Sequence, residues 1–144
     1  MARSVQITFD CSDVDRLSRF YAAALHYKIQ DPPEGFATWE AALEAWGVPR
    51  EEWYDGSHII DPEGKGPRIY FQRMDTPKPG KNRLHLDMDA SGGRSISLEE
   101  RRNQIDAEVG RLVTLGATKQ LAWEEVGWYS VVMLDPEGNE FCVR

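Results

Sequence analysis

The sequence has few cysteines, a deficit of positive charge and no long hydrophobic run. Its two cysteines, Cys11 and Cys142, do not have zinc-finger spacing, so we expect reduced thiols in a cytoplasmic protein. No apolar run approaches the ~18–20 residues of a membrane-spanning helix, and the first residues lack the hydrophobic region of a signal peptide. The net charge is −7, and we do not expect an acidic chain of this kind to bind nucleic acid.

What the sequence does contain is a repeated tetrapeptide, Asp-Pro-Glu-Gly, at residues 61–64 and again at residues 135–138. Each copy lies between an apolar run and a second strand-like run, which is the pattern of a β-hairpin. Proline presets φ for a turn and glycine accepts a positive φ, so the tetrapeptide has a mechanical reason to recur. The copies lie about half a chain apart, which predicts one domain, residues 1–144, built from two similar modules.

The periodicity of apolar residues predicts the same order of elements, β-α-β-β-β, in each half of an α+β fold. We expect module one at about residues 4–75, a linker rich in Pro and Gly at about 75–81, and module two at about 82–144. In module one we expect a helix over residues 13–25 and an extra helix over 36–47. The expected strands of this module span residues 5–11, 28–30, 57–60 and 68–72. In module two we expect a helix over residues 98–115. The expected strands of this module span residues 83–89, 118–123, 129–134 and 139–143.

Three stretches carry a resemblance to a known superfamily. They are Asp13 with the apolar residues that follow it to Leu25, the Leu115-Gly-Ala117 step, and the closing run of residues 135–141. They resemble the vicinal oxygen chelate superfamily, which includes glyoxalase I, extradiol dioxygenases and bleomycin- and fosfomycin-resistance proteins. The runs 67–73 and 81–87 resemble its glyoxalase-like subgroup. The resemblance implies two βαβββ modules whose curved sheets form an open cleft, and a homodimer.

The same resemblance implies four cleft-facing positions that hold a metal in members that bind one: Gln6, Gln72, His85 and Cys142. Two neutral amides, one imidazole and one thiol offer at most one negative charge to a divalent ion. We therefore expect no catalytic metal and no other cofactor. The alternative is a divalent metal at these four residues, and the imidazole and the thiol favour zinc.

His85 lies between two leucines on a half-buried strand, so it is either a structural histidine or a cleft residue. We take it as a cleft residue and assign His85 and Asp87 as the candidate acid–base pair. Asp10 and Asp89 are expected at strand ends in solvent, and the orientation of His58 is left open. The candidate ligand-binding residues are Gln6, Thr8, His58, Tyr70, Gln72, Arg83 and Cys142.

Charge and aromatic content give two further hypotheses about a ligand. Four cations near the module junction form either a solvated surface or a lip that attracts an anion: Arg73, Lys78, Lys81 and Arg83. Two of the five tryptophans, Trp39 and Trp46, are expected to pack a helix. The other three lie near turns and strand ends, where they either pack or form the wall of a cleft: Trp53, Trp123 and Trp128.

Two classes of function remain. The first is a protein that binds a small molecule, anionic or aromatic, in the cleft between the modules without a catalytic metal, as bleomycin-resistance relatives do with a drug. The second is an enzyme of the vicinal oxygen chelate type. It would be a metal-dependent lyase, isomerase or dioxygenase, or a metal-free enzyme that uses His85 and Asp87 as acid and base.

Overall fold

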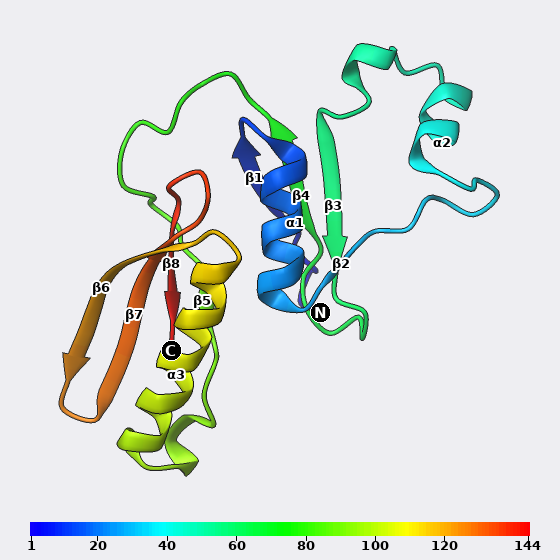
Figure 1. Ribbon diagram of the computed structural model, residues 1–144. Helices are drawn as coiled ribbons and strands as arrows, with labels where there is room; N and C mark the ends of the chain where they lie inside the picture. The colour runs from blue at the N-terminus through cyan, green and yellow to red at the C-terminus, as the bar shows by residue number, and fades with distance from the viewer. The chain divides into compact units, whose positions relative to one another are not determined.

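Each half of the chain forms a four-stranded mixed sheet with one long helix against one of its faces (Figure 1). The computed structural model describes residues 1–144 and divides them into a first unit, Met1–Pro77, and a second unit, Lys78–Arg144. The boundary between the units lies inside the Pro- and Gly-rich stretch 75–81. Each unit is described by itself below.

In the first unit the strands follow the order β1-β4-β3-β2, with β1 parallel to β4 and the other pairs antiparallel. The helix α2 and a short 3-10 turn, Arg50–Glu52, are inserted between β2 and β3. The elements of this unit are β1 (Ile7–Cys11), α1 (Val14–Leu25), β2 (Lys28–Ile29), α2 (Trp39–Ala45), β3 (Gly56–Ile60) and β4 (Ile69–Arg73).

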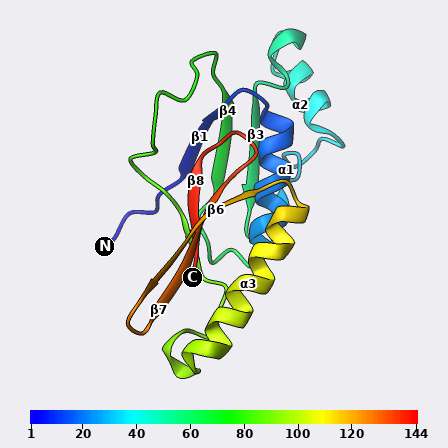
Figure 2. The same cartoon turned by 60° about the vertical axis from the view of Figure 1, so that its left-hand side comes forward.

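The second unit repeats this topology with the order β5-β8-β7-β6, in which β5 is parallel to β8 and the other pairs are antiparallel. Figure 2 shows α3 running along its sheet. The elements are β5 (Asp87–Met88), a 3-10 turn (Gly93–Ser95), α3 (Leu98–Thr114), β6 (Thr118–Glu125), β7 (Trp128–Leu134) and β8 (Glu140–Val143). The predicted pair of βαβββ modules is therefore confirmed in order and direction, and each sheet is open, since its edge strands do not pair with each other.

The two Asp-Pro-Glu-Gly turns use the aspartate in the same way. Asp61 accepts hydrogen bonds from the backbone N–H groups of Glu63, Lys65 and Gly66 at 2.8–3.0 Å. Asp135 accepts from the N–H of Glu137 at 2.8 Å and from both the N–H and the side-chain amide of Asn139. The fourth residue of each copy, Gly64 or Gly138, has a positive φ, so the repeat encodes the same turn twice.

The core of the first unit lies between α1 and the face of the sheet that points toward it. Asp13 caps the helix by accepting from the N–H of Arg16 at 3.0 Å. His26 ends the helix in the left-handed conformation at φ 57°. The residues that fill this core are almost fully buried: Leu17, Phe20, Tyr21, Ile59, Ile69 and Phe71.

The second unit has an equivalent core between α3 and the inner face of β7 and β8. Ser97 caps α3 by accepting from the N–H of Glu100 at 3.1 Å. Most of the large apolar residues of α3 are buried, but Val113 is 47% exposed. The buried residues are Ile105, Val109 and Leu112 of α3 with Val131, Met133, Phe141 and Val143 of the sheet.

Several element bounds differ from those expected. β1 begins at Ile7, where its pairing with β4 begins, and Val5 before it is 72% exposed; α2 covers only Trp39–Ala45 of the expected 36–47. The strand expected at 83–89 is limited to Asp87–Met88, although Leu86 and Ala90 continue the hydrogen bonding to the strand β8 and Arg144. None of the helices combines the length and the apolar character needed to cross a membrane.

Candidate functional site

The face of the first sheet that points away from α1 carries most of the site residues predicted in this unit. Thr8, Tyr70 and His58 lie side by side on β1, β4 and β3, because the register pairs Thr8 with Tyr70 and Tyr70 with His58. The His58 and Tyr70 rings stack with centroids 4.4 Å apart. Gly56 leaves room for the tyrosine, since a Cβ there would lie 2.7 Å from the Tyr70 hydroxyl.

The two glutamines predicted on this face are both engaged in hydrogen bonds. The Gln6 side-chain oxygen accepts from Arg68 at 2.8 Å, and the same guanidinium donates to Gln30 at 2.7 Å. The Gln72 amide donates to the Asp10 carboxylate at 2.6 Å. Asp10 is thus a partner of Gln72 rather than a carboxylate in solvent alone. The convergence of both glutamines with His85 and Cys142 stays a prediction.

An aromatic pocket of about 510 Å³ lies beside this face, under the insertion that contains α2. His58 and Tyr70 form its sheet side. The Trp39 ring stacks toward His58 at 6.4 Å and meets the Trp46 ring edge-on at 6.5 Å. The remaining large side chains that line it are Ile29, Leu43, Val48, Trp53 and Tyr54.

Two tryptophans of this pocket are held in place by their indole N–H groups. Trp39 donates to the carbonyl oxygen of Gln30 at 2.7 Å, and Trp53 donates to that of Val48 at 2.8 Å. Trp39 and Trp46, expected mostly to pack a helix, also line the pocket. Their spacing of seven residues on a short helix was the sequence signal for a shared face.

The polar lining of the pocket is acidic. Four carboxylates contribute to it: Asp15, Glu40, Glu52 and Asp55. Two of them have cationic partners outside the pocket lining, since Asp15 pairs with Arg19 at 2.8 Å and Asp55 with Arg73 at 3.5 Å. Aromatic faces and carboxylates both attract positive charge, so this pocket is suited to flat, neutral or cationic molecules.

His58 is neutral at physiological pH. Burial, reinforced by the positive charge of Arg68, lowers the pKa of His58 from 6.5 to about 4. A neutral imidazole stacks on Tyr70 without adding positive charge to the pocket. The His58 ring therefore lines the aromatic pocket as a neutral group.

We expect this shift to make the first unit less stable in acid. The pKa of His58 is lower in the folded chain than in the unfolded one, so the unfolded chain binds more protons between pH 6.5 and about 4. Stability therefore falls as the pH drops through this window. The full shift corresponds to about 3 kcal/mol, and partial solvent exposure reduces the expected loss to about 1–2 kcal/mol.

Urea unfolding of the wild type and of His58→Phe at pH 7.5 and pH 4.5 measures this contribution. The carboxylates titrate in both proteins, so the difference between them isolates His58. An equal loss of stability in the two proteins would show that His58 does not cause it.

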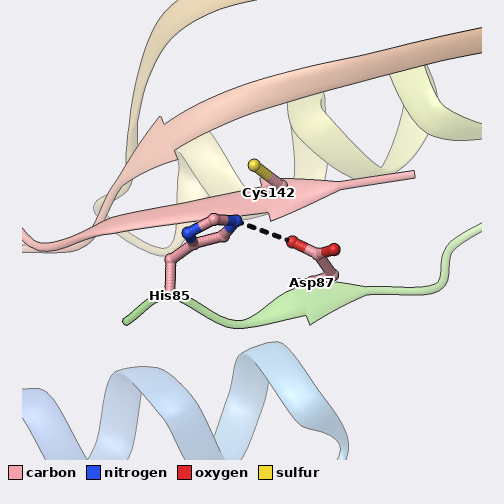
Figure 3. Close-up of side chains that lie close together, drawn as sticks. All are labelled: His85, Asp87 and Cys142. Atoms are coloured by element: carbon pink, nitrogen blue, oxygen red, sulfur yellow. Dashed lines mark ion pairs between the residues drawn. The ribbon is translucent and has the colours of Figure 1, made fainter. Parts of the chain in front are cut away.

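In the second unit, three predicted site residues come together on the face of the sheet opposite α3 (Figure 3). Asp87 on β5 lies directly opposite Cys142 on β8 in the register. The Nε2 atom of His85, two residues before Asp87, lies 3.2 Å from the Asp87 carboxylate. The ligand atoms of the three side chains all lie within 4.8 Å of one another.

The surroundings of Cys142 keep its thiol protonated. Burial raises the pKa of Cys142, and the negative charge of Asp87 raises it further, against a smaller opposite effect of Lys81. Arg144 approaches the same aspartate, with its Nε atom 3.7 Å from Asp87 and 3.2 Å from Asp89. A neutral thiol is a poor nucleophile, so this arrangement does not by itself favour thiolate catalysis.

Alkylation is expected to report this environment directly. Cys142 should react with iodoacetamide at pH 8 more slowly than free glutathione, because its pKa is raised. Asp87→Asn should increase the rate several-fold by removing the adjacent negative charge. Peptide mass spectrometry follows Cys142, and Cys11, only 4% exposed, is the unreactive internal reference. An unchanged rate in Asp87→Asn would contradict the role of the carboxylate.

The cations predicted near the module junction differ in their surroundings. Arg83 is exposed. Lys78 bonds Glu140 at 3.3 Å, and Arg73 pairs with Asp55, so two of the four cations expected to form an anion-attracting lip already have acidic partners. Trp123 is 51% exposed on β6 and does not line the aromatic pocket, whereas Trp53 does.

Comparisons with known proteins agree with this architecture. A sequence model of the glyoxalase-like domain matches residues 6–144. No curated protein matches the chain significantly. Among solved structures, the chain is similar to an enzyme of the glyoxalase/bleomycin resistance protein/dioxygenase family from Burkholderia phytofirmans PsJN. The identity is 18% and the TM-score 0.61, over 96% of this chain and 94% of that one.

Two further structures show the same fold. One is a possible glyoxalase from Bacillus cereus, with 11% identity and a TM-score of 0.60 over 99% of this chain and 98% of that one. The other is a mutant of the fosfomycin resistance protein FosX from Listeria monocytogenes, complexed with manganese(II) and 1S,2S-dihydroxypropylphosphonic acid. Its identity is 14% and its TM-score 0.61, over 100% of this chain and 90% of that one. Because the family model matches residues 6–144, nearly the whole chain, the chain belongs to the glyoxalase-like domain family.

Proposed function

We propose that the protein binds a small, flat aromatic molecule in the pocket of the first unit, without a catalytic metal. The observation that carries this proposal is the pocket itself, about 510 Å³ lined by four large aromatic rings and His58 and Tyr70. Its volume is in the range of small-molecule sites, and aromatic walls with few polar groups are typical of them. Stacking on these rings needs no metal.

The charge of the lining narrows the ligand class. Glu40 and Glu52 line the pocket, and His58 adds no positive charge at neutral pH. An aromatic ligand that carries an amine or a quaternary nitrogen gains from both the carboxylates and the ring faces. An anionic ligand meets repulsion in this pocket, so of the two ligand types expected from the sequence, we retain the aromatic one here.

Thioflavin T, a flat cationic dye, is a suitable probe, with the anionic dye 8-anilinonaphthalene-1-sulfonate for comparison. Trp46→Ala removes a pocket wall that is 56% exposed, so it should not unfold the protein. Trp123→Ala on β6 removes an equally exposed tryptophan, 51%, outside the pocket. The loss of one aromatic wall is worth roughly 1–2 kcal/mol, or about 5- to 30-fold in affinity.

We expect saturable binding of thioflavin T. Its affinity should fall about 5- to 30-fold in Trp46→Ala and stay unchanged in Trp123→Ala. Glu40→Gln should reduce the preference for the cationic dye. Equal weakening in both tryptophan variants, or tighter binding of the anionic dye at the same site, would refute the proposal.

A second candidate function is a metal-dependent lyase, isomerase or dioxygenase, favoured by the convergence of His85, Asp87 and Cys142. The carboxylate of Asp87 makes this donor set better than the four residues inferred from the sequence. An imidazole, a carboxylate and a thiol fit zinc with one position left for water or substrate. Zinc there would act as a Lewis acid and lower the pKa of a bound water. Without metal, His85 and Asp87 remain an acid–base pair.

Zinc protection of the thiol separates this candidate from the first. Zinc binding requires loss of the Cys142 proton, so a stoichiometric amount of zinc should slow alkylation of Cys142 by at least tenfold. His85→Asn should remove this protection. If zinc leaves the alkylation rate unchanged, the metal-dependent candidate is wrong, whereas the dye experiment above is unaffected.

We also propose that the chain forms a homodimer in the cytoplasm. β6 is an eight-residue strand at the edge of its sheet, and all of its residues are exposed. Proteins rarely leave such a long edge uncovered, because it offers its backbone to another chain. Light scattering at micromolar concentration tests this, and the mass of one chain, 16.4 kDa, would contradict it.

A further inference from the structure

The second unit contains another pocket, of about 400 Å³, with a lining opposite in charge to the first. It lies where the loop after β5, the first turn of α3, the start of β7 and the end of β8 meet. Three arginines line it, Arg94, Arg101 and Arg144, together with the rings of Trp128 and Tyr129. Asp89 is its one acidic residue.

The side chain of Arg101 gives the main evidence for an anion in this pocket. Its Nε atom is buried and has no hydrogen-bond partner. A guanidinium stays charged at all physiological pH values, and a buried donor without an acceptor is costly. Because Arg101 lies in the first turn of the 17-residue helix α3, it stands at the end of the helix that carries positive potential. Both features favour a negatively charged acceptor in this pocket.

Arg144 adds a second cation that is held in place by its neighbours. Its guanidinium lies over the Trp128 ring at 5.8 Å, and its Nε atom lies 3.2 Å from the Asp89 carboxylate. That Nε atom is also buried and makes no hydrogen bond, so the approach to Asp89 is an ion pair alone. The pocket lining thus contains three guanidinium groups and one carboxylate, and Arg144 also approaches Asp87 outside the lining at 3.7 Å, so the lining is positive in a chain of net charge −7.

We propose that this pocket binds the oxyanion group, phosphate, phosphonate or carboxylate, of a small molecule. Arg101 and Arg94 donate to the oxyanion, because the fork of guanidinium N–H groups matches these groups in geometry. Trp128 and Tyr129 form the wall for the attached part of the ligand. The backbone N–H groups of Gly92 and Gly93 already bond Gln104 and Ser91, so the arginines are the donors. This site goes beyond the functions proposed above: it lies in the other unit from the aromatic pocket and takes the opposite charge, and its lining does not include His85, Asp87 or Cys142.

The test is calorimetric titration with inorganic phosphate and, separately, with acetate, at constant ionic strength. Arg101→Gln removes the central donor, and Arg94→Gln removes an exposed one that cannot disturb the core. Arg111→Gln is the matched control, because Arg111 is on the same helix, bonds Glu108 and does not line the pocket. Thermal unfolding confirms that each variant is folded.

We expect saturable binding of at least one of the two anions. Binding should weaken about tenfold in Arg101→Gln, a loss typical of one charged hydrogen bond, and measurably in Arg94→Gln, with no change in Arg111→Gln. Preference for phosphate or for acetate assigns the group that the ligand carries. No saturable binding of either anion, or equal binding by wild type and both pocket variants, would overturn the proposal. If Arg101→Gln does not fold, undiminished binding by Arg94→Gln overturns it.

Discussion

Replacing Phe71 by alanine is expected to remove about 3–5 kcal/mol from the stability of the first unit. Phe71 lies on the central strand β4, is fully buried, and stacks on Phe9 at 5.3 Å and on Tyr21 at 5.9 Å. Alanine would leave a cavity between the sheet and α1 and remove both ring contacts. Since a domain of this size is typically stable by only 5–15 kcal/mol, this loss is enough to unfold much of the unit at 37 °C.

Urea unfolding followed by far-UV circular dichroism measures this change. Tyr54→Ala is the control, because it also replaces an aromatic ring by a methyl group but at a position that is 70% exposed. We expect less than about 0.5 kcal/mol for that variant. A similar small loss in Phe71→Ala would mean that the ring is not part of a packed core.

Asp135→Ala is expected to destabilise the second unit by about 2–4 kcal/mol. The Asp135 side chain is only 3% exposed, and its carboxylate accepts three hydrogen bonds within the turn that joins β7 to β8. Alanine would leave the N–H groups of Glu137 and Asn139 without these acceptors. The strand β8, which carries Cys142, depends on this turn for its register.

The equivalent aspartate of the first Asp-Pro-Glu-Gly turn, Asp61, is the comparison for this prediction. Asp61 makes the equivalent bonds in the first unit, and the N–H of Glu63 together with those of Gly66 and Lys65 lowers the pKa of its carboxyl. Asp61 lies at an exposed turn, where water can replace the lost bonds, so Asp61→Ala should cost clearly less than Asp135→Ala in the same urea experiment. An equal loss of unfolding free energy in the two variants would show that burial of the turn does not affect the stability that its aspartate contributes.

Local pattern was sufficient to predict much of this fold. The two Asp-Pro-Glu-Gly turns and the order of strands and helices in each half were readable because each depends on residues close together in the chain. The alternation of side chains also placed Thr8, Tyr70 and Gln72 on one face, since strand geometry sends every second residue to the same side.

The sites were less predictable because they depend on contacts between distant segments. Asp87 was assigned as a partner of His85 but not as a neighbour of Cys142, and that contact exists only because β5 pairs with β8. Trp39 and Trp46 looked like packing residues, since nothing in a helical period tells whether a helix lies on a sheet or over a cavity. Arg94 and Arg101 carried no motif at all.

By itself, then, the sequence determined the two βαβββ units, their turns and the alternation of side chains along the strands, because these follow from periodicity and turn chemistry within a few residues. Only the tertiary structure decided which side chains meet: the aromatic and acidic pocket under α2, the cluster of His85, Asp87 and Cys142, and the arginine-lined pocket beside α3. The physical reason is that strand pairing and helix docking bring together residues whose spacing along the chain carries no trace of that contact.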